Sequence, residues 1–67
     1  MKFEIWTFSD DKGVAWHLEQ CEGPSSNYQA FMRHVNEQPM KAEKVHTFEA
    51  DSEVEARKTL RSLQFGE

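Results

Sequence analysis

The chain has 67 residues, a single cysteine and a formal net charge of −4. This length allows one small domain near the lower limit for folding without disulfides or metals, and the lone Cys21 excludes an internal disulfide and indicates a reducing, cytoplasmic setting. The modest acidic charge argues against non-specific binding to nucleic acid or a membrane surface, and no apolar run approaches the roughly 20 residues that span a bilayer.

The chain begins with two strand-like runs. Lys2–Ser9 and Val14–Gln20 are rich in aromatic and β-branched residues, and the sequence DDKG between them is typical of a tight turn. Aspartates with glycine at the last position favour a type I turn followed by a residue at positive φ, a loop that normally inserts a one-residue bulge. We therefore predict an antiparallel hairpin with a bulge at the turn.

Two registers of this hairpin distribute the side chains differently. The first pairs Asp10 with Val14. One face then carries Trp6, Phe8, Val14, Trp16 and Leu18. The other face carries Phe3, Ile5, Ala15, His17 and Cys21. The second register pairs Ser9 with Val14, which puts Glu4 opposite Glu19, a repulsive pair. It also groups on one face Trp6, Phe8 and His17. Turn chemistry and charge both favour the first register.

A loop and a helix follow the hairpin. Gly23 and Pro24 end the second strand, and Ser25 or Ser26 can cap the helix. We expect this helix to end near Asn36–Pro39. One of its faces is defined by apolar residues at i, i+3, i+4 and i+7, namely Tyr28, Phe31, Met32 and Val35.

The rest of the chain predicts a third strand and a second helix. The strand covers about Lys44–Ala50, with alternating side chains. Ser52 and Glu55 form a capping-box pair that opens the helix. Phe65 closes the chain, and the narrow apolar stripe of the helix consists of Ala56, Leu60 and Leu63.

The predicted order β-β-α-β-α defines an α+β domain over residues 1–67, which we expect to be a complete small gene product. A crossover through the first helix lets the third strand lie antiparallel beside the first, in the spatial order 2-1-3. Pairing beside the second strand is the alternative. A right-handed crossover places the first helix on one sheet face, and the second helix packs most simply beside it. We therefore predict a two-layer sandwich, with a three-stranded antiparallel sheet and two helices packed on one face.

Most aromatic residues are expected in the core, because two short helices need large apolar side chains beneath them. The predicted core joins two sets of side chains. The sheet provides Trp6, Phe8, Trp16, Leu18 and Phe48. The helices provide Tyr28, Phe31, Met32, Val35, Leu60 and Leu63.

The second sheet face would then lie uncovered, and exposed apolar patches commonly mark interfaces. The protein-interface candidates on this face are Phe3, Ile5, Ala15 and His17. We expect another protein to cover it, and a symmetric homodimer is the simplest arrangement.

No motif in the sequence indicates catalysis, a cofactor or a metal site. Cys21 and His17 lie four residues apart on a strand, about 13 Å along it, and the spacings typical of zinc ligands are absent from the sequence. The carboxylate pairs have structural explanations in a turn and a helix start. We therefore expect a non-enzymatic protein without cofactor or metal.

The basic residues indicate an alternative function. Arg57, Lys58 and Arg61 cluster on one side of the second helix, and Lys41 and Lys44 lie near the adjoining strand. A small patch among glutamates is more typical of a solvated helix face than of a nucleic-acid footprint. Our main expectation is a cytoplasmic protein-binding module, an adaptor, regulator or inhibitor of the kind that bacteria and phages encode. The alternative is nucleic-acid binding through the basic helix face.

Overall fold

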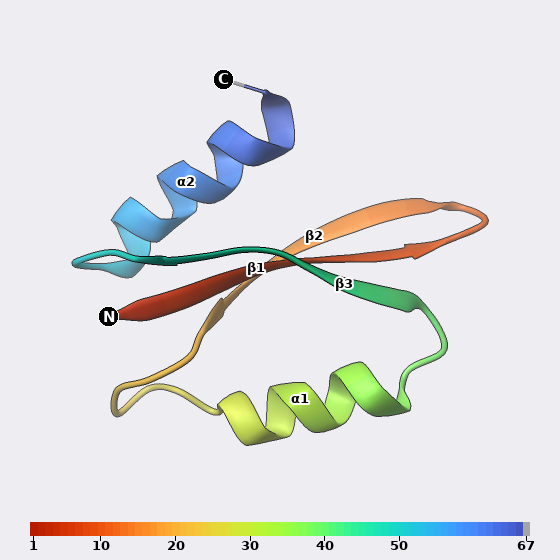
Figure 1. The fold of residues 1–67 in the computed structure, drawn as a ribbon, viewed down its shortest axis with the longest axis horizontal. Coiled ribbons are helices and arrows are strands. Elements are labelled where there is room, and N and C mark those ends of the chain that lie inside the picture. Colours follow the sequence, from red (N-terminus) through yellow and green to blue (C-terminus); the bar gives the residue numbers. More distant parts are fainter. Residues whose placement is uncertain (67) are drawn as a thin grey trace.

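The structure, a computed structural model, describes residues 1–66 and has the predicted element order β-β-α-β-α (Figure 1). The elements are β1 (Lys2–Asp10), β2 (Gly13–Gln20), α1 (Tyr28–Glu37), β3 (Lys41–Glu49) and α2 (Glu53–Phe65). The three strands form an antiparallel sheet in the order β2-β1-β3, which confirms the α+β topology. β3 begins at Lys41, earlier than the expected start near Lys44.

The hairpin of β1 and β2 has the register that the sequence patterns disfavoured. Asp10 pairs with Gly13 and Ser9 with Val14, which leaves a two-residue loop and an uninterrupted β1–β2 ladder. Asp10 Oδ1 accepts a hydrogen bond from the Lys12 amide at 2.8 Å, and Gly13 has φ 150°, a conformation that favours glycine. The predicted register and its bulge are therefore wrong. The one-residue shift moves every β2 side chain to the other face.

The repulsion expected between Glu4 and Glu19 is relieved because each carboxylate has its own partners. Glu4 accepts hydrogen bonds from Trp6 and Tyr28, and Glu19 Oε1 lies 2.8 Å from His17 Nε2. The contact from Tyr28 comes from α1, so it is invisible to a rule that considers only cross-strand pairs. Tertiary hydrogen bonding therefore stabilises the observed register.

The two helices cover opposite faces of the sheet, which makes three layers instead of the expected two (Figure 1). The reason lies in β1, whose large apolar side chains point to both faces. Phe3 and Ile5 are buried on one face, and Trp6 and Phe8 are buried on the other. Each apolar face needs its own cover, so the prediction that both helices pack on one face is wrong.

The face beneath α1 holds an aromatic core. Trp6 and Phe8 of β1 are buried together with Phe31 of α1, and the Trp6 and Phe31 rings meet edge-on with centroids 5.6 Å apart. Partly buried apolar side chains surround them, namely Tyr28, Met32, Val35, Met40 and Ala42. The helical spacing therefore predicted the packing face of α1 correctly.

The start of α1 differs from the prediction. Its N-cap is Asn27, which makes no capping hydrogen bond with its side chain. Ser26, one of the predicted caps, donates its hydroxyl to the Gln20 carbonyl at 2.9 Å instead. This contact fastens the loop before α1 to the end of β2.

The face beneath α2 is closely packed. Phe3 and Ile5 are 1% and 0% exposed, and Ala56 of α2 is 0% exposed. Phe48 of β3 stacks on Phe3 with ring centroids 5.9 Å apart. Because the side chain of alanine is small, the helix backbone can approach the sheet, and α2 lies closest to β2. Trp16 and Leu18, predicted in the core with Trp6, share this face by the observed register and are partly buried.

The start of α2 is as predicted, and its end is less buried than expected. Ser52 Oγ accepts a hydrogen bond from the Glu55 amide at 3.2 Å, the expected cap. Leu63 and Phe65 are 40% and 67% exposed. The apolar stripe of α2 therefore contacts the sheet mainly at its N-terminal half.

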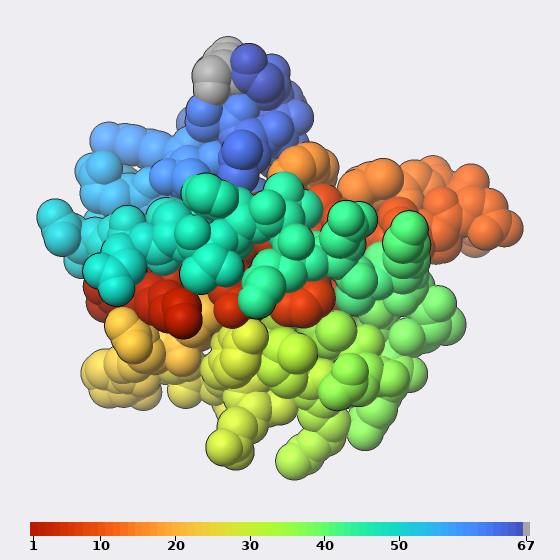
Figure 2. All heavy atoms as spheres, in the orientation of Figure 1, coloured from red at the N-terminus to blue at the C-terminus, as the bar shows by residue number. Residues whose placement is uncertain are grey.

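The two edges of the sheet differ in regularity. β3 shifts register between the partners of Ile5 and Trp6, which leaves Val45 as an extra residue in the strand. The tip of the β1–β2 hairpin projects beyond both helices (Figures 1 and 2). Figure 2 also shows β3 crossing the front of the molecule between α2 and α1.

Candidate functional site

The face beneath α1 is incompletely covered, and an open groove of about 310 Å³ lies beside the hairpin. We call it the aromatic groove. β1 and β2 provide one wall, and α1 with the segment after it provides the other. The lining residues are Phe8, Ala15, Trp16, His17, Phe31, His34, Gln38 and Met40.

Aromatic rings form most of the groove wall. His17 stacks on Phe31 with centroids 5.0 Å apart and an interplanar angle of 15°. Phe8 lies edge-on to Phe31 at 6.3 Å and 6.2 Å from the rings of both His17 and His34. Such packed rings present a fixed apolar surface, because each is held in place by the others.

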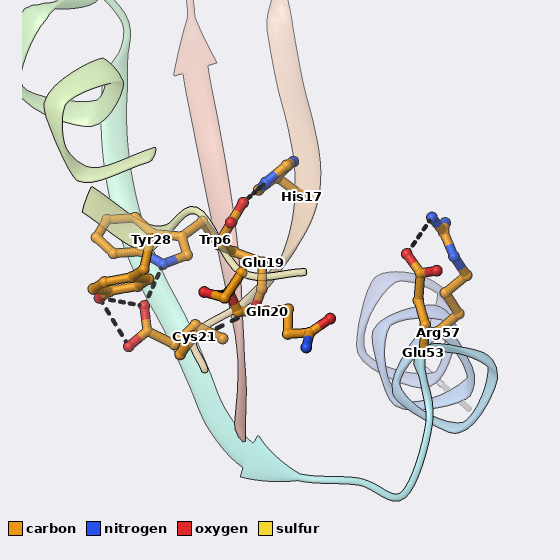
Figure 3. Close-up of polar contacts among 10 residues, drawn as sticks. Trp6, His17, Glu19, Gln20, Cys21, Tyr28, Glu53 and Arg57 are labelled. Atoms are coloured by element: carbon orange, nitrogen blue, oxygen red, sulfur yellow. Dashed lines mark hydrogen bonds and ion pairs between the residues drawn. The ribbon is translucent and has the colours of Figure 1, made fainter. Parts of the chain in front are cut away.

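Two hydrogen-bonded units hold the side chains of His17 and Gln38 in the groove wall. His17 Nε2 lies 2.8 Å from Glu19 Oε1, an arrangement in which the ring donates through Nε2 and a neutral ring keeps Nδ1 as an acceptor (Figure 3). Gln38 donates to the Met40 carbonyl at 2.8 Å and accepts from the Met40 amide at 3.1 Å. The groove is therefore a largely apolar surface that also carries the imidazoles of His17 and His34.

A buried carboxylate lies on the same sheet face. Glu4, 5% exposed, accepts hydrogen bonds from Trp6 Nε1 at 2.9 Å and from the Tyr28 hydroxyl at 2.8 and 3.0 Å, and Lys44 Nζ lies 3.8 Å from Oε2. We call these four residues the Glu4 cluster, of which Figure 3 labels Trp6 and Tyr28. Burial raises the pKa of Glu4, but the hydrogen bonds from Trp6 and Tyr28 and the charge of Lys44 outweigh it, so the pKa lies below its ordinary value.

The groups around Glu4 are held in their protonated forms. Burial and the hydrogen bond to the Glu4 carboxylate raise the pKa of Tyr28 to about 12. Burial and the same carboxylate raise the pKa of the Cys21 thiol to about 11. The cluster therefore fixes α1 to β1 by an ionic hydrogen-bond network, with no reactive thiolate at neutral pH.

The structure separates the four predicted interface residues. Phe3 and Ile5 are buried on the α2 face and have no free surface for a partner, so the expectation that their sheet face is uncovered is wrong. Ala15 and His17 lie on the opposite face and line the aromatic groove. The cause is the register shift, which exchanges the faces of β2 while leaving β1 in place.

The predicted basic residues lie in three separate places. Lys44 extends toward Glu4 on the α1 side of the sheet, whereas Arg57, Lys58 and Arg61 lie on α2 beyond the other face. Lys41 is exposed at the start of β3. Thus the structure does not bring the five cations into one surface.

The cations of α2 are matched by acidic neighbours. Arg57 lies 3.1 Å from Glu53 (Figure 3), and Lys58 lies 3.3 Å from Glu55, with all four side chains more than half exposed. Exposed helix pairs of this kind contribute only a few tenths of a kcal/mol. They lower the positive potential of this helix face.

The sequence patterns predicted Phe31 on the packing face of α1 but did not place His34, Gln38 or Met40 beside it. His34 is exposed, but it follows Phe31 by three residues, shares its helical face and lines the groove. This three-residue spacing is the feature of the sequence that could have placed His34 beside Phe31. Gln38 and Met40 follow the helix end, where neither helical nor strand periodicity applies, so their position depended on how the chain turns back to β3.

Two other features that can mark a functional site are a cluster of metal-ligating side chains and a second hollow. The described residues include no group of three or more histidine, cysteine or acidic side chains that could hold a metal ion. A larger, open hollow of about 560 Å³ lies where β3 meets α2, and its walls are mostly polar. It is lined by Glu49, Ala50, Asp51, Ser52, Glu55 and Thr59.

Comparison with protein families, curated proteins and solved structures found no match to this chain. Neither helix in residues 1–66 is long and apolar enough to span a membrane.

Proposed function

We propose that the chain is a small non-enzymatic protein-binding module whose aromatic groove receives an apolar side chain of a partner protein. The observation that supports this is the groove itself, an open hollow of about 310 Å³ walled by the stacked rings of His17 and Phe31 and by Phe8. Binding hot spots are typically pockets that desolvate a single large side chain of the partner.

The size of the groove favours one side chain as the occupant. Small-molecule sites commonly occupy about 300–1,000 Å³ and enclose most of the ligand. This groove lies at the lower end of that range and is open, so an aromatic or branched aliphatic side chain fits its volume and its ring surfaces. When the ring is neutral and donates through Nε2, the Nδ1 of His17 can accept one hydrogen bond from the partner backbone.

Binding also fits the state of the polar groups. The imidazole of His17 is engaged with Glu19, and the amide of Gln38 is engaged with Met40. These contacts stiffen the walls, which reduces the entropy lost when a partner is ordered against them. We place the module in the cytoplasm, in keeping with its lone unpaired thiol, Cys21.

Selection from a phage-displayed peptide library tests the proposal. We expect peptides with an aromatic or branched aliphatic anchor that shift the amide resonances of Ala15, His17 and His34. The variant His34→Trp, which fills the groove from α1, should weaken their binding about tenfold or more, equivalent to about 1.4 kcal/mol. The matched control Arg33→Trp places the same side chain on the neighbouring exposed position of α1 and should leave binding unchanged. Equal binding to both variants would overturn the proposal, as would selection of no binder.

Nucleic-acid binding through α2 remains the alternative function. The exposed cations Arg57, Lys58 and Arg61 support it, and the pairing of the first two with Glu53 and Glu55 counts against it. A groove lined by rings and an aliphatic thioether has no such opposing feature, so we favour protein binding.

A further inference from the structure

The outer edge of β2 has free backbone hydrogen-bonding groups. The Cys21 amide donates to the Lys2 carbonyl at 2.8 Å, which makes this a hydrogen-bonded pair of the antiparallel ladder. Because such pairs alternate, the odd-numbered residues of β2 bond to β1, and the N–H and C=O groups of Val14, Trp16 and Leu18 point outward. The described residues provide no backbone partner for these groups.

The two edges of the sheet are protected to different degrees. β3 has the extra residue Val45 and the exposed Lys41 and Lys44, features that obstruct pairing with another strand. β2 has a regular register from Gly13 to Gln20 and contains no lysine, arginine or proline. Val14 at its start is 60% exposed. The β2 edge is therefore the one that can accept a further strand.

We propose that β2 pairs antiparallel with β2 of a second copy of this chain, about a two-fold axis at Trp16. The two sheets then join into one continuous sheet in the order β3-β1-β2-β2-β1-β3. This inference goes beyond the proposed function, because it uses the strand edge and does not depend on the occupant of the groove.

The side chains of β2 favour its own copy as the partner in this register. Across a two-fold axis at Trp16, Val14 lies opposite Leu18 of the second copy, and Trp16 lies opposite its own counterpart. The side chains that meet on the α2 face at the centre of the joint are then all apolar, and directly opposed apolar pairs stabilise sheets. Moving the axis to His17 or Leu18 sets Gln20 against Val14 or Trp16, which loses this match.

The shape of the molecule leaves room for the second copy. The hairpin tip, which carries Val14, projects beyond both helices (Figure 1). Since the paired β2 strands run antiparallel, the uncovered tip of each copy lies beside the covered end of the other. The α2 helices therefore lie at opposite ends of the joint. On the α1 face, Ala15 lies opposite His17 of the second copy, so each aromatic groove borders the joint.

Sedimentation velocity over a range of concentrations tests the pairing. We expect the wild-type chain to form a dimer as the concentration rises, and Val14→Pro, which removes an outward N–H at an edge position that tolerates proline, to stay monomeric. The matched control Val45→Lys changes an exposed valine on the other edge and should dimerise like the wild type. A wild-type monomer at near-millimolar concentration would overturn the proposal, and so would a dimer that folded Val14→Pro leaves intact.

Disulfide trapping keeps the test decisive if Val14→Pro does not fold. In a Cys21→Ser background, Ala15→Cys and His17→Cys proteins are mixed and oxidised. The proposed register places these two positions in a non-hydrogen-bonded pair, where side chains are close enough for a disulfide. We expect the mixed disulfide to predominate. Predominant His17→Cys homodimer would overturn the register, and absence of any cross-linked dimer would overturn the pairing.

Discussion

The two faces of the sheet are covered by helices of similar size in different ways. On the α2 face, Phe3 and Ile5 of β1 and Ala56 of α2 are almost fully buried. On the α1 face, the aromatic core shares the interface with the buried carboxylate of Glu4 and leaves the aromatic groove open. A close apolar contact leaves little surface for a partner, whereas a layer built of large rings leaves hollows between them. The α1 face therefore combines a buried core with an open hollow.

The largest change in stability is expected at Phe31, whose ring belongs both to the core and to the wall of the aromatic groove. Phe31→Ala should lower the free energy of unfolding by about 3–5 kcal/mol, since it removes a buried ring that packs on Trp6 and Phe8. Urea denaturation followed by tryptophan fluorescence measures this. The control Phe65→Ala, at a side chain 67% exposed, should change stability little. Near-native stability of Phe31→Ala would show that the α1 face is not the main core.

The next largest change in stability is expected on the α2 face, where α2 packs closely on the sheet. Ala56→Leu adds a branched side chain where the residue is 0% exposed, and overpacking of this kind costs about 1–3 kcal/mol. Val54→Leu, at a position of α2 that is 66% exposed, is the matched control and should be nearly neutral. Thermal unfolding compares the two variants. A stabilising Ala56→Leu would mean that α2 has space to accept a larger residue.

The Glu4 cluster should make stability depend on pH. Because the folded pKa of Glu4 lies below its value in the unfolded chain, ionised Glu4 stabilises the fold above the unfolded pKa of about 4.3, and this contribution is lost as the pH falls through the folded pKa. Glu4→Gln should lower the free energy of unfolding by about 1–3 kcal/mol near neutral pH. The difference from wild type should shrink in acid.

Urea denaturation of both proteins at neutral and acidic pH measures this dependence. The control Glu22→Gln changes an exposed carboxylate in the loop after β2 and should show no such trend. If Glu4→Gln lowered the free energy of unfolding by the same amount at neutral and acidic pH, the result would contradict the ionic character of the cluster.

The smallest expected effect concerns the basic side of α2. We expect no mobility shift of duplex or single-stranded oligonucleotides at physiological salt, and we expect the triple change of Arg57, Lys58 and Arg61 to Ala to leave the fold intact. Phosphate contacts would reveal themselves as binding that falls with salt, with a log–log slope near −0.9 per contact on duplex DNA. A micromolar, salt-sensitive complex that the triple variant loses would favour the alternative function over protein binding.

The sequence predicted what depends on local patterns. The element order, the strand order, the packing face of α1 and the Ser52 cap follow from periodicity and capping chemistry within short segments. The predicted hairpin register was wrong because the observed register is stabilised by a distant residue. Tyr28 lies on α1 and donates a hydrogen bond to Glu4, which no pattern within the two strands reveals. The placement of the two helices was wrong for a separate reason, because β1 has large buried apolar side chains on both faces. Of the predicted interface residues, Ala15 and His17 lie at the candidate site, but they reach it through the register that the patterns disfavoured.

The place of β1 in the sheet also bears on the order of folding. β1 comes first in the chain but lies in the middle of the sheet. It pairs with β2 across a two-residue loop. Its partners in β3 are much more distant in sequence and run from Lys41, opposite Ser9, to Glu49, opposite Lys2. Strands that are close in sequence pair quickly, whereas strands that are far apart must first close a long loop, which costs entropy. The β1–β2 hairpin should therefore form early and β3 should join late. During synthesis, the second edge of β1 stays unpaired until the chain through Glu49 has left the ribosome. We therefore expect the nascent chain to be most prone to aggregation in the interval between completion of β2 and emergence of β3.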